Sequence, residues 1–147
     1  MLNALTMMAA QDRGGTFGVL VDPKGFLLES CVLNAVIITE AGMLLTPTFE
    51  RALAGTTVRR VMELAKRSLV GSLLKDVKQE RVKLEDVRKA KEIFLCAGDT
   101  HLYAITQFDG KQVGDGRIGP VFTAVHKMLL HDAAHGSEHH QPILSLA

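Results

Sequence analysis

The sequence has few of the residues that mark secreted or membrane-spanning proteins. Its 147 residues include only two cysteines, Cys31 and Cys96, and both stand in apolar segments. Two such cysteines are typical of reduced thiols and do not make a disulfide framework. No apolar run is long enough to span a bilayer, and the first ten residues lack the basic start and long apolar stretch of a signal peptide. We therefore expect a soluble, intracellular protein of the cytoplasm.

The chain also lacks an excess of charge of either sign. Seventeen basic and sixteen acidic side chains give a net charge of +1, and 47% of the residues are apolar. This balance argues against disorder and against a broad nucleic-acid-binding surface, so neither nucleic acid nor a membrane is an expected partner. The length corresponds to about one domain with a real core.

Apolar spacing in the first third predicts a helix followed by strands. Leu2, Leu5, Met8 and Ala9 share one helical face, and Gly14-Gly15 end that helix. Alternating apolar segments separated by turn residues then predict an antiparallel meander. Its expected strands cover residues 16–22, 26–30, 34–40 and 43–47.

The remaining two thirds mix helices with strands. Helical spacing predicts long helices over about 53–69 and 119–133, the second with Pro120 in its first turn. Between them we expect an edge strand over 77–82, a short helix from Leu84, and a strand, loop and strand from 92 onward. The predicted fold class is α/β (α+β), with a mostly antiparallel sheet curled into a barrel-like layer and flanked by helices.

Glu29 is the first candidate functional residue. It ends the apolar segment FLLES, where an extended and largely buried strand is expected. A buried carboxylate is costly unless a cation or hydrogen-bond donors compensate it, so Glu29 suggests a bound positive group. The alternative is a solvent-facing glutamate on an edge strand.

Two segments have the composition of an anion site. Gly55-Thr56-Thr57 begins a predicted helix, where free backbone N–H groups, two hydroxyls and the positive end of the helix dipole favour a phosphate. The loop Ala97-Gly98-Asp99-Thr100 again offers N–H groups beside a glycine. Simple helix capping and a plain hairpin turn are the alternatives.

The end of the chain is rich in histidine. His131 and His135 are four residues apart, a spacing found in zinc sites. However, Gly136 interrupts the helix, and no glutamate follows His131 to form an HExxH motif. We therefore expect no metal site, and instead a flexible tail over residues 134–147 that also contains His139 and His140.

Taken together, the motifs resemble those of a known family. The ordered series ESCVLN, LLTPTF, LAGTTVRRVMELA, FLCAGDTHLYAI and GDGRIGP resembles the class IV aminotransferases, which are fold-type-IV pyridoxal-phosphate enzymes. That family includes branched-chain and D-amino-acid aminotransferases and aminodeoxychorismate lyases, and the plant-type D-amino-acid aminotransferases look most similar. The resemblance covers Leu2 to Asp132, so the expected domain, over residues 1–133, is the family's larger cofactor-binding domain.

The resemblance implies a role for each candidate. Glu29 matches the glutamate that bonds the pyridine nitrogen of pyridoxal 5'-phosphate, and the buried cation that Glu29 suggested would be that pyridinium. Leu53 matches the residue on the ring face, and Asn34 an asparagine that supports the strand after the glutamate. The remaining positions match the two phosphate-binding segments; they are Thr56 and Thr57, and, within one residue, Ala97 and Gly98.

The sequence departs from the family's pattern at two places. Members usually carry a serine or threonine where this chain has Ala97 and Gly98, so this loop is expected to offer a phosphate backbone donors only. The family's Schiff-base lysine is also missing: it stands about thirty residues before the glutamate, and counting back from Glu29 runs past Met1. The resemblance implies that the family's smaller N-terminal domain, which closes over the substrate, is missing too. None of Lys24, Lys66 and Lys127 lies in the matching strand. We therefore expect an inactive chain with weak cofactor binding, arising from a truncated gene model, a splice product or a degenerate paralogue.

Three interpretations remain open at this point. The first is a transaminase acting on an amino acid and a 2-oxo acid, the second is an aminodeoxychorismate-type lyase, and the third is a non-catalytic chain. The resemblance further implies a homodimer, and a plastid location if a preceding segment carries a transit peptide.

Overall fold

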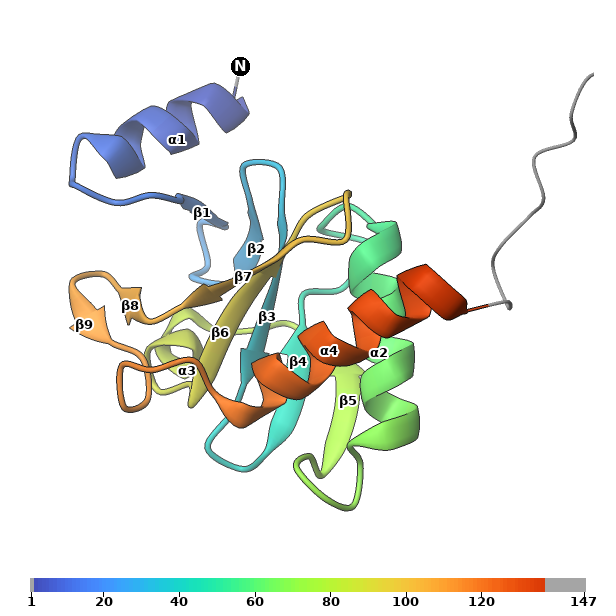
Figure 1. Cartoon of the computed structure of the whole chain (residues 1–147). Coiled ribbons are helices and arrows are strands. Elements are labelled where there is room, and N and C mark those ends of the chain that lie inside the picture. Colours follow the sequence, from blue (N-terminus) through green and yellow to red (C-terminus); the bar gives the residue numbers. More distant parts are fainter. Residues whose placement is uncertain (1, 137–147) are drawn as a thin grey trace, which may run out of the picture.

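In the computed structural model, which describes residues 2–136, one mixed sheet is covered on both faces (Figure 1). Its strand order is β5-β4-β3-β6-β7, and β3 lies at its centre between β4 and β6. The strands are β3 (Asn34–Ile38), β4 (Met43–Thr46), β5 (Asp76–Gln79), β6 (Glu92–Cys96) and β7 (Leu102–Ile105). All neighbours pair antiparallel except β4 and β5, which run parallel.

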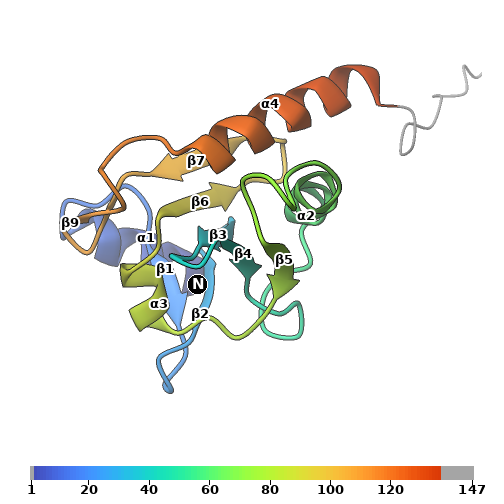
Figure 2. The same ribbon diagram turned by 90° about the horizontal axis from the view of Figure 1, so that it is seen from below.

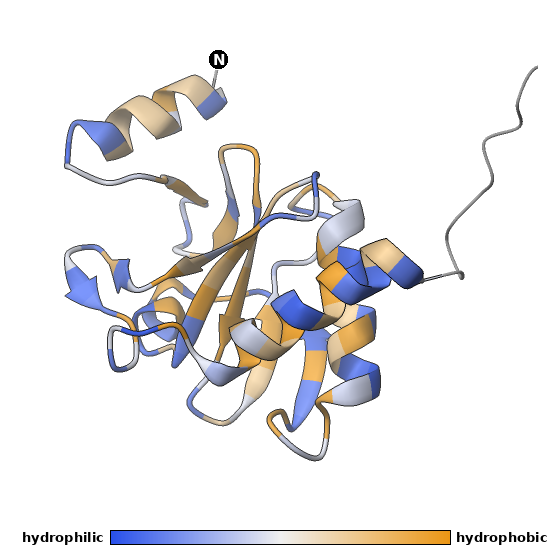
Figure 3. Ribbon diagram, viewed as in Figure 1, coloured by the Kyte–Doolittle hydropathy of each residue, from blue (hydrophilic) through white to orange (hydrophobic). Residues whose placement is uncertain are grey.

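The two central strands explain why the sequence contains unbroken apolar runs. Every residue of β3 and β6 is buried, and alternate side chains contribute to separate cores on opposite faces of the sheet. Val36 and Phe94 belong to one core, whereas Ala35 and Leu95 belong to the other. A strand covered on both faces has no solvent-facing side, so it lacks the alternation of apolar and polar residues that is typical of a half-exposed strand. Figure 3 shows these strands as the apolar centre of the molecule.

Two helices cover the first face, as Figure 2 shows. They are α2 (Thr56–Ser68) and α4 (Pro120–His135). In α2 the residues Val58, Val61 and Ala65 are buried, which is the spacing of one helical face. Helix α2 connects β4 to β5, and this crossover allows the two strands to run parallel.

The opposite face is covered by shorter elements. These are the hairpin of β1 (Val19–Val21) and β2 (Leu27–Ser30), and the helix α3 (Leu84–Arg88). A small hairpin of β8 (Gln107–Phe108) and β9 (Lys111–Gln112) follows β7. The first helix, α1 (Leu2–Gln11), lies at the edge of the molecule, where it borders a cavity of about 1110 Å³.

The structure corrects the predicted barrel. Within residues 2–136 the sheet is open, with β5 and β7 as its edges. The predicted meander also breaks, because β2 pairs with β1 in a separate two-stranded sheet and the chain changes sheets at Ser30–Leu33, where the Ser30 N–H donates to the Leu33 carbonyl at 2.8 Å. The predicted class, with a mostly antiparallel sheet and flanking helices, is confirmed.

Several element boundaries differ from the prediction. The helix expected from residue 53 begins at Thr56, because the backbone of Gly55 before it is extended. The first strand shortens to Val19–Val21, and the edge strand ends at Gln79. Helix α4 continues to His135 and is followed by Gly136, and the predicted tail from residue 137 on, with His139 and His140, lies outside the described residues. Among the described helices, none has the length and apolar character needed to cross a membrane.

Candidate functional site

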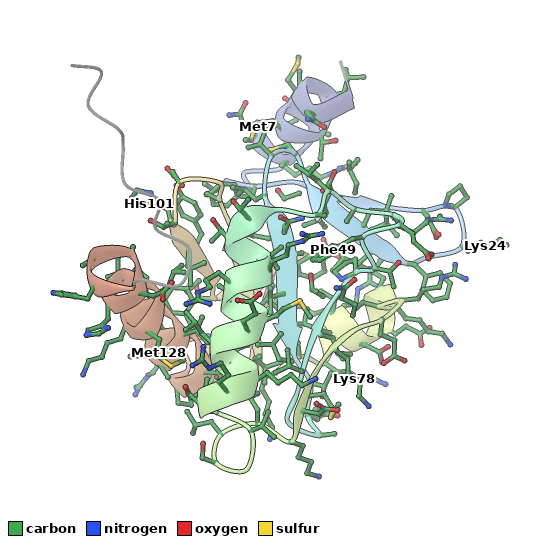
Figure 4. All side chains as sticks on the ribbon, turned by 90° about the vertical axis from the view of Figure 1, so that its right-hand side faces the viewer. Met7, Lys24, Phe49, Lys78, His101 and Met128 are labelled. Atoms are coloured by element: carbon green, nitrogen blue, oxygen red, sulfur yellow. The ribbon has the colours of Figure 1, made fainter. Side chains whose placement is uncertain are left out.

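A cavity of about 570 Å³ lies where the start of α2 meets the loop between β6 and β7. The two predicted anion-binding segments, about 40 residues apart in the sequence, both line it, through Thr56, Thr57 and Gly98. In Figure 4 the labelled His101 marks this loop beside the first turn of α2. The rest of the lining comes from the same loop and from α2 and α4; it includes Thr100, Arg59, Arg60, Glu63, Leu129 and Asp132.

The start of α2 has no side-chain cap. Its N-cap residue is Gly55, which carries no side chain that could accept from the first-turn N–H groups. Thr57 is only 5% exposed, and its hydroxyl makes no hydrogen bond with another residue in the described part of the chain. The described residues include no buried side-chain oxygen without a partner, so the unpartnered Thr57 hydroxyl is not itself enclosed, and beside a helix N-terminus it is suited to an anion in this cavity.

The loop between β6 and β7 is held in an unusual conformation. Ala97 is buried, and its N–H donates to the His101 carbonyl at 2.9 Å. Thr100 adopts a φ of 67°, which is rare for a β-branched residue. The neighbouring Asp99 and His101 are joined by a side-chain contact of 2.9 Å between Oδ2 and Nδ1. The loop thus presents Gly98 and Thr100 to the cavity.

Glu29 and Asn34 meet at the backbone of Leu53. The Leu53 N–H donates to Glu29 Oε2 at 2.9 Å, and Asn34 Nδ2 donates to the Leu53 carbonyl at 2.7 Å. The side chain of Leu53 itself is 73% exposed. Asn34 therefore fixes the loop before α2, a contact that the resemblance, which gave it a strand-supporting role, did not suggest.

Glu29 is neither fully buried nor fully solvent-facing. It is half-buried on β2, and the Leu53 N–H is a donor that compensates its carboxylate. Gly55 follows two residues after Leu53, so close to Asn34 that a Cβ there would overlap the asparagine oxygen. Leu53, which Glu29 contacts, and the Thr56-Thr57 helix start consequently belong to a single, tightly held segment.

The two arginines beside the cavity contact other side chains of the protein. Arg60 forms a fork with Asp132, at 2.8 Å from Nε and 2.6 Å from Nη2, and this pair joins α2 to α4. Arg59 lies over the ring of Phe49, 5.5 Å from its centroid. Stacking over a ring does not use the guanidinium N–H groups, so the donors beside the cavity are hydroxyls, backbone N–H groups and Arg59.

Two other ionisable groups near the site have shifted pKa values. Burial raises the pKa of the Asp99 carboxyl, but hydrogen bonds from the His101 and Asp99 N–H groups and the His101 ring outweigh it, so the pKa lies below its ordinary value. Burial raises the pKa of the Cys96 thiol to about 12, so this thiol is not a nucleophile near neutral pH.

The histidines of α4 do not form a metal centre in the described region. His131 and His135 stack with their ring centroids 4.8 Å apart, and His135 Nδ1 lies 3.3 Å from the His131 carbonyl oxygen. Within residues 2–136, no three His, Cys, Asp or Glu side chains are grouped so that they could hold a metal.

Sequence reasoning missed the fork between Arg60 and Asp132 and did not single out Thr100. The hydroxyl three residues after Ala97 was a visible signal for Thr100. No sequence signal pairs residues 72 positions apart, such as Arg60 and Asp132.

Comparison with known proteins identifies the family. The family model described as amino-transferase class IV matches residues 1–108. The chain belongs to the class IV aminotransferase family. The match includes Glu29, Leu53, the start of α2 and the Gly98 loop, and therefore most of the site described above.

Several relatives support this assignment. The chloroplastic D-amino-acid transaminase of Arabidopsis thaliana is 32% identical over 135 residues, which are 91% of this chain and 36% of that protein. The branched-chain amino acid aminotransferase of Escherichia coli has a solved structure with 28% identity and a TM-score of 0.79, covering 88% of this chain and 42% of that one. This class IV aminotransferase chain thus spans about a third of the length of the D-amino-acid transaminase.

A third relative shows the fold with a cofactor. The branched-chain amino acid aminotransferase of Thermobaculum terrenum, solved in its pyridoxal-phosphate-bound holo-form, has a TM-score of 0.81 at 22% identity. The match covers 92% of this chain and 43% of that one. The bound cofactor belongs to that protein, and at this identity the likeness shows the fold alone.

Proposed function

We propose that this chain binds pyridoxal 5'-phosphate as part of a class IV aminotransferase. The observation that carries the proposal is the cavity in which the α2 start and the Gly98 loop meet beside the segment held by Glu29. The phosphate would be held by Thr56, Thr57 and the backbone of Gly98. Glu29 would face the pyridine nitrogen, and the exposed side chain of Leu53 would cover the ring.

The residues present fit such a group. A phosphate needs N–H and hydroxyl donors, which the uncapped start of α2 and the unpartnered Thr57 hydroxyl offer within the described chain. A pyridinium needs a carboxylate, and Glu29 retains Oε1 after Oε2 accepts from Leu53. Asn34 donates to the Leu53 carbonyl, so the backbone of the residue that would cover the ring is already held without a ligand.

The proposed activity is amino-group transfer between an amino acid and a 2-oxo acid, in a protein that also supplies the Schiff-base lysine missing from this chain. Bound pyridoxal phosphate supplies an electron sink for the substrate's α-carbon. Glu29 would strengthen that property, because its negative charge would favour the protonated form of the ring nitrogen. The named relatives are D-amino-acid and branched-chain aminotransferases, and this supports transamination as the reaction class.

Calorimetric titration with pyridoxamine phosphate tests the proposal. We expect Glu29→Gln to weaken binding about tenfold, since the neutral amide loses one charge-assisted hydrogen bond but can still accept from Leu53. Glu40→Gln, at an exposed turn, is the matched control and should bind as the wild type does. Equal affinity of Glu29→Gln and wild type would show that Glu29 does not face the pyridine nitrogen.

A further inference from the structure

The loop between β6 and β7 offers the cavity few donors at its first two residues. Ala97 is buried, and its N–H is already bonded to the His101 carbonyl. Gly98 lines the cavity but has no side chain, so only its backbone can contribute. Thr100 is the loop's hydroxyl-bearing residue among those that line the cavity.

We propose that Thr100 is a further phosphate-binding residue, whose hydroxyl supplies the side-chain donor that Gly98 cannot. This inference rests on the proposed function, because it assigns one more donor to the same site. Thr100 and the buried, unpartnered Thr57 line one cavity from two different elements. Thr100, unlike Thr57, is exposed, and within the described chain its hydroxyl makes no hydrogen bond to another residue.

The backbone of Thr100 is consistent with this role. Its φ of 67° places a β-branched residue in the left-handed region, which favours glycine and disfavours threonine. Such conformations persist only where the surroundings impose them, and they cluster at ligand-binding sites. Here the surroundings are the contacts between Asp99 and His101 on either side: the His101 N–H donates to Asp99 Oδ1 at 3.3 Å, and the side chains pair at 2.9 Å.

Two substitutions separate a binding role from a structural one. Thr100→Val keeps the β-branched shape and the backbone preference and removes only the hydroxyl. Thr100→Gly removes the hydroxyl and also relieves the left-handed backbone. If Thr100 serves the stability of the loop, Thr100→Gly should lower the melting temperature. If Thr100 serves phosphate binding, Thr100→Gly should raise the melting temperature and weaken phosphate binding.

The experiment measures binding of pyridoxamine phosphate, pyridoxamine and inorganic phosphate by calorimetry, and the melting temperature of each variant. We expect Thr100→Val to weaken both phosphate-bearing probes about tenfold, as the loss of one hydrogen bond to a charged group would, and to leave pyridoxamine unaffected. Thr100→Ser should restore most of the affinity. Thr100→Gly should bind phosphate weakly but melt at a higher temperature than the wild type. Thr106→Val, at an exposed threonine outside this cavity, is the control.

The outcomes distinguish this inference from the proposed function. If Thr57→Val weakens pyridoxamine phosphate but both Thr100 variants bind it as the wild type does, the assignment of Thr100 is wrong and the proposed function stands. If the Thr100 variants lose affinity but Glu29→Gln does not, Thr100 binds phosphate and the pyridoxal assignment falls. If the wild type binds no phosphate-bearing probe, both proposals fall.

Discussion

Leu53 combines an exposed side chain with a backbone held on both sides. Its N–H and carbonyl are bonded by Glu29 and Asn34, which stand 24 and 19 residues before it. These two hydrogen bonds restrict the backbone of Leu53, while its apolar side chain stays exposed to water, which is unfavourable. Glu29 and Asn34, which are themselves candidate site residues, therefore also position the backbone of a third candidate, Leu53.

Asp22 plays a comparable role at a neighbouring turn. Its carboxylate is 4% exposed, accepts from the N–H groups of Lys24 and Phe26 at 2.9 Å, and pairs with Arg51 at 2.9 Å and Arg81 at 3.6 Å. Arg51 belongs to the loop that carries Leu53, so Asp22 ties the hairpin turn of β1 and β2 to the site.

This arrangement predicts a pH dependence of stability. The Phe26 N–H, opposed by burial and helped by Lys24, Arg51 and Arg81, holds the pKa of Asp22 below its ordinary value. Because the folded pKa is lower than the unfolded one, which is about 3.9, Asp22 stabilises the fold above about pH 4 and loses this contribution as the pH falls through the folded pKa.

Urea unfolding between about pH 7 and pH 3 should therefore show a smaller loss of stability for Asp22→Asn than for the wild type, together with lower stability at neutral pH. Asp12→Asn, at an exposed position, should follow the wild type. Parallel curves for Asp22→Asn and wild type would contradict this account.

The two long helices begin in different ways. The first turn of α4 is closed by Glu92, which is 8% exposed and accepts from the N–H groups of Val121 at 2.9 Å and Phe122 at 2.7 Å. The start of α2 has no such carboxylate among the described residues and faces a cavity. Each helix dipole favours an anion at this end; the protein supplies it for α4, and at α2 the proposed ligand would supply it.

Glu92 should consequently be important for stability. Glu92→Ala leaves two buried N–H groups without an acceptor, and we expect a loss of about 2–4 kcal/mol in the free energy of unfolding. Gly119→Ala should also destabilise, because its Cβ would overlap the Glu92 carboxylate. Denaturant unfolding measures both variants, with the exposed Glu40→Ala as control. A loss for Glu92→Ala no greater than that for Glu40→Ala would contradict the capping role.

At the scale of the whole molecule, several large apolar side chains are exposed. Leu5 and Met8 on α1 are 54% and 58% exposed, and Val32 and Leu53 are each 73% exposed. The D-amino-acid transaminase is longer than this chain, which covers 36% of it. Exposed apolar surface of this kind favours contact with further protein surface.

We therefore predict self-association, as the family resemblance implies. Size-exclusion chromatography with light scattering should show dimers or larger species whose fraction rises with concentration. Replacing Leu5 and Met8 by glutamine should shift the protein toward monomer. The same replacement at Leu73 and Leu130, which are exposed elsewhere, should have less effect. A monomer at every concentration would contradict the prediction.

The sequence alone determined the elements and the candidate residues. Apolar segments between turn residues indicated the strands β3 and β6, and helical spacing indicated α2 and α4, because the periodicity of burial on a helix follows from its backbone geometry. The Gly-Thr-Thr helix start and the Ala-Gly-Asp-Thr loop were recognisable as candidate anion-binding segments, because glycine and hydroxyl residues act through local chemistry.

Only the tertiary structure decided how these parts are placed. The parallel pairing of β4 with β5, the change of sheet after β2 and the open sheet depend on contacts between distant segments. Contacts between distant segments also give the hydrogen bonds that join Glu29 and Asn34 to the Leu53 backbone. They place Thr57 and Thr100 in the lining of one cavity. Local propensity carries no information about such long-range partners, since they are chosen by packing the whole chain around one sheet.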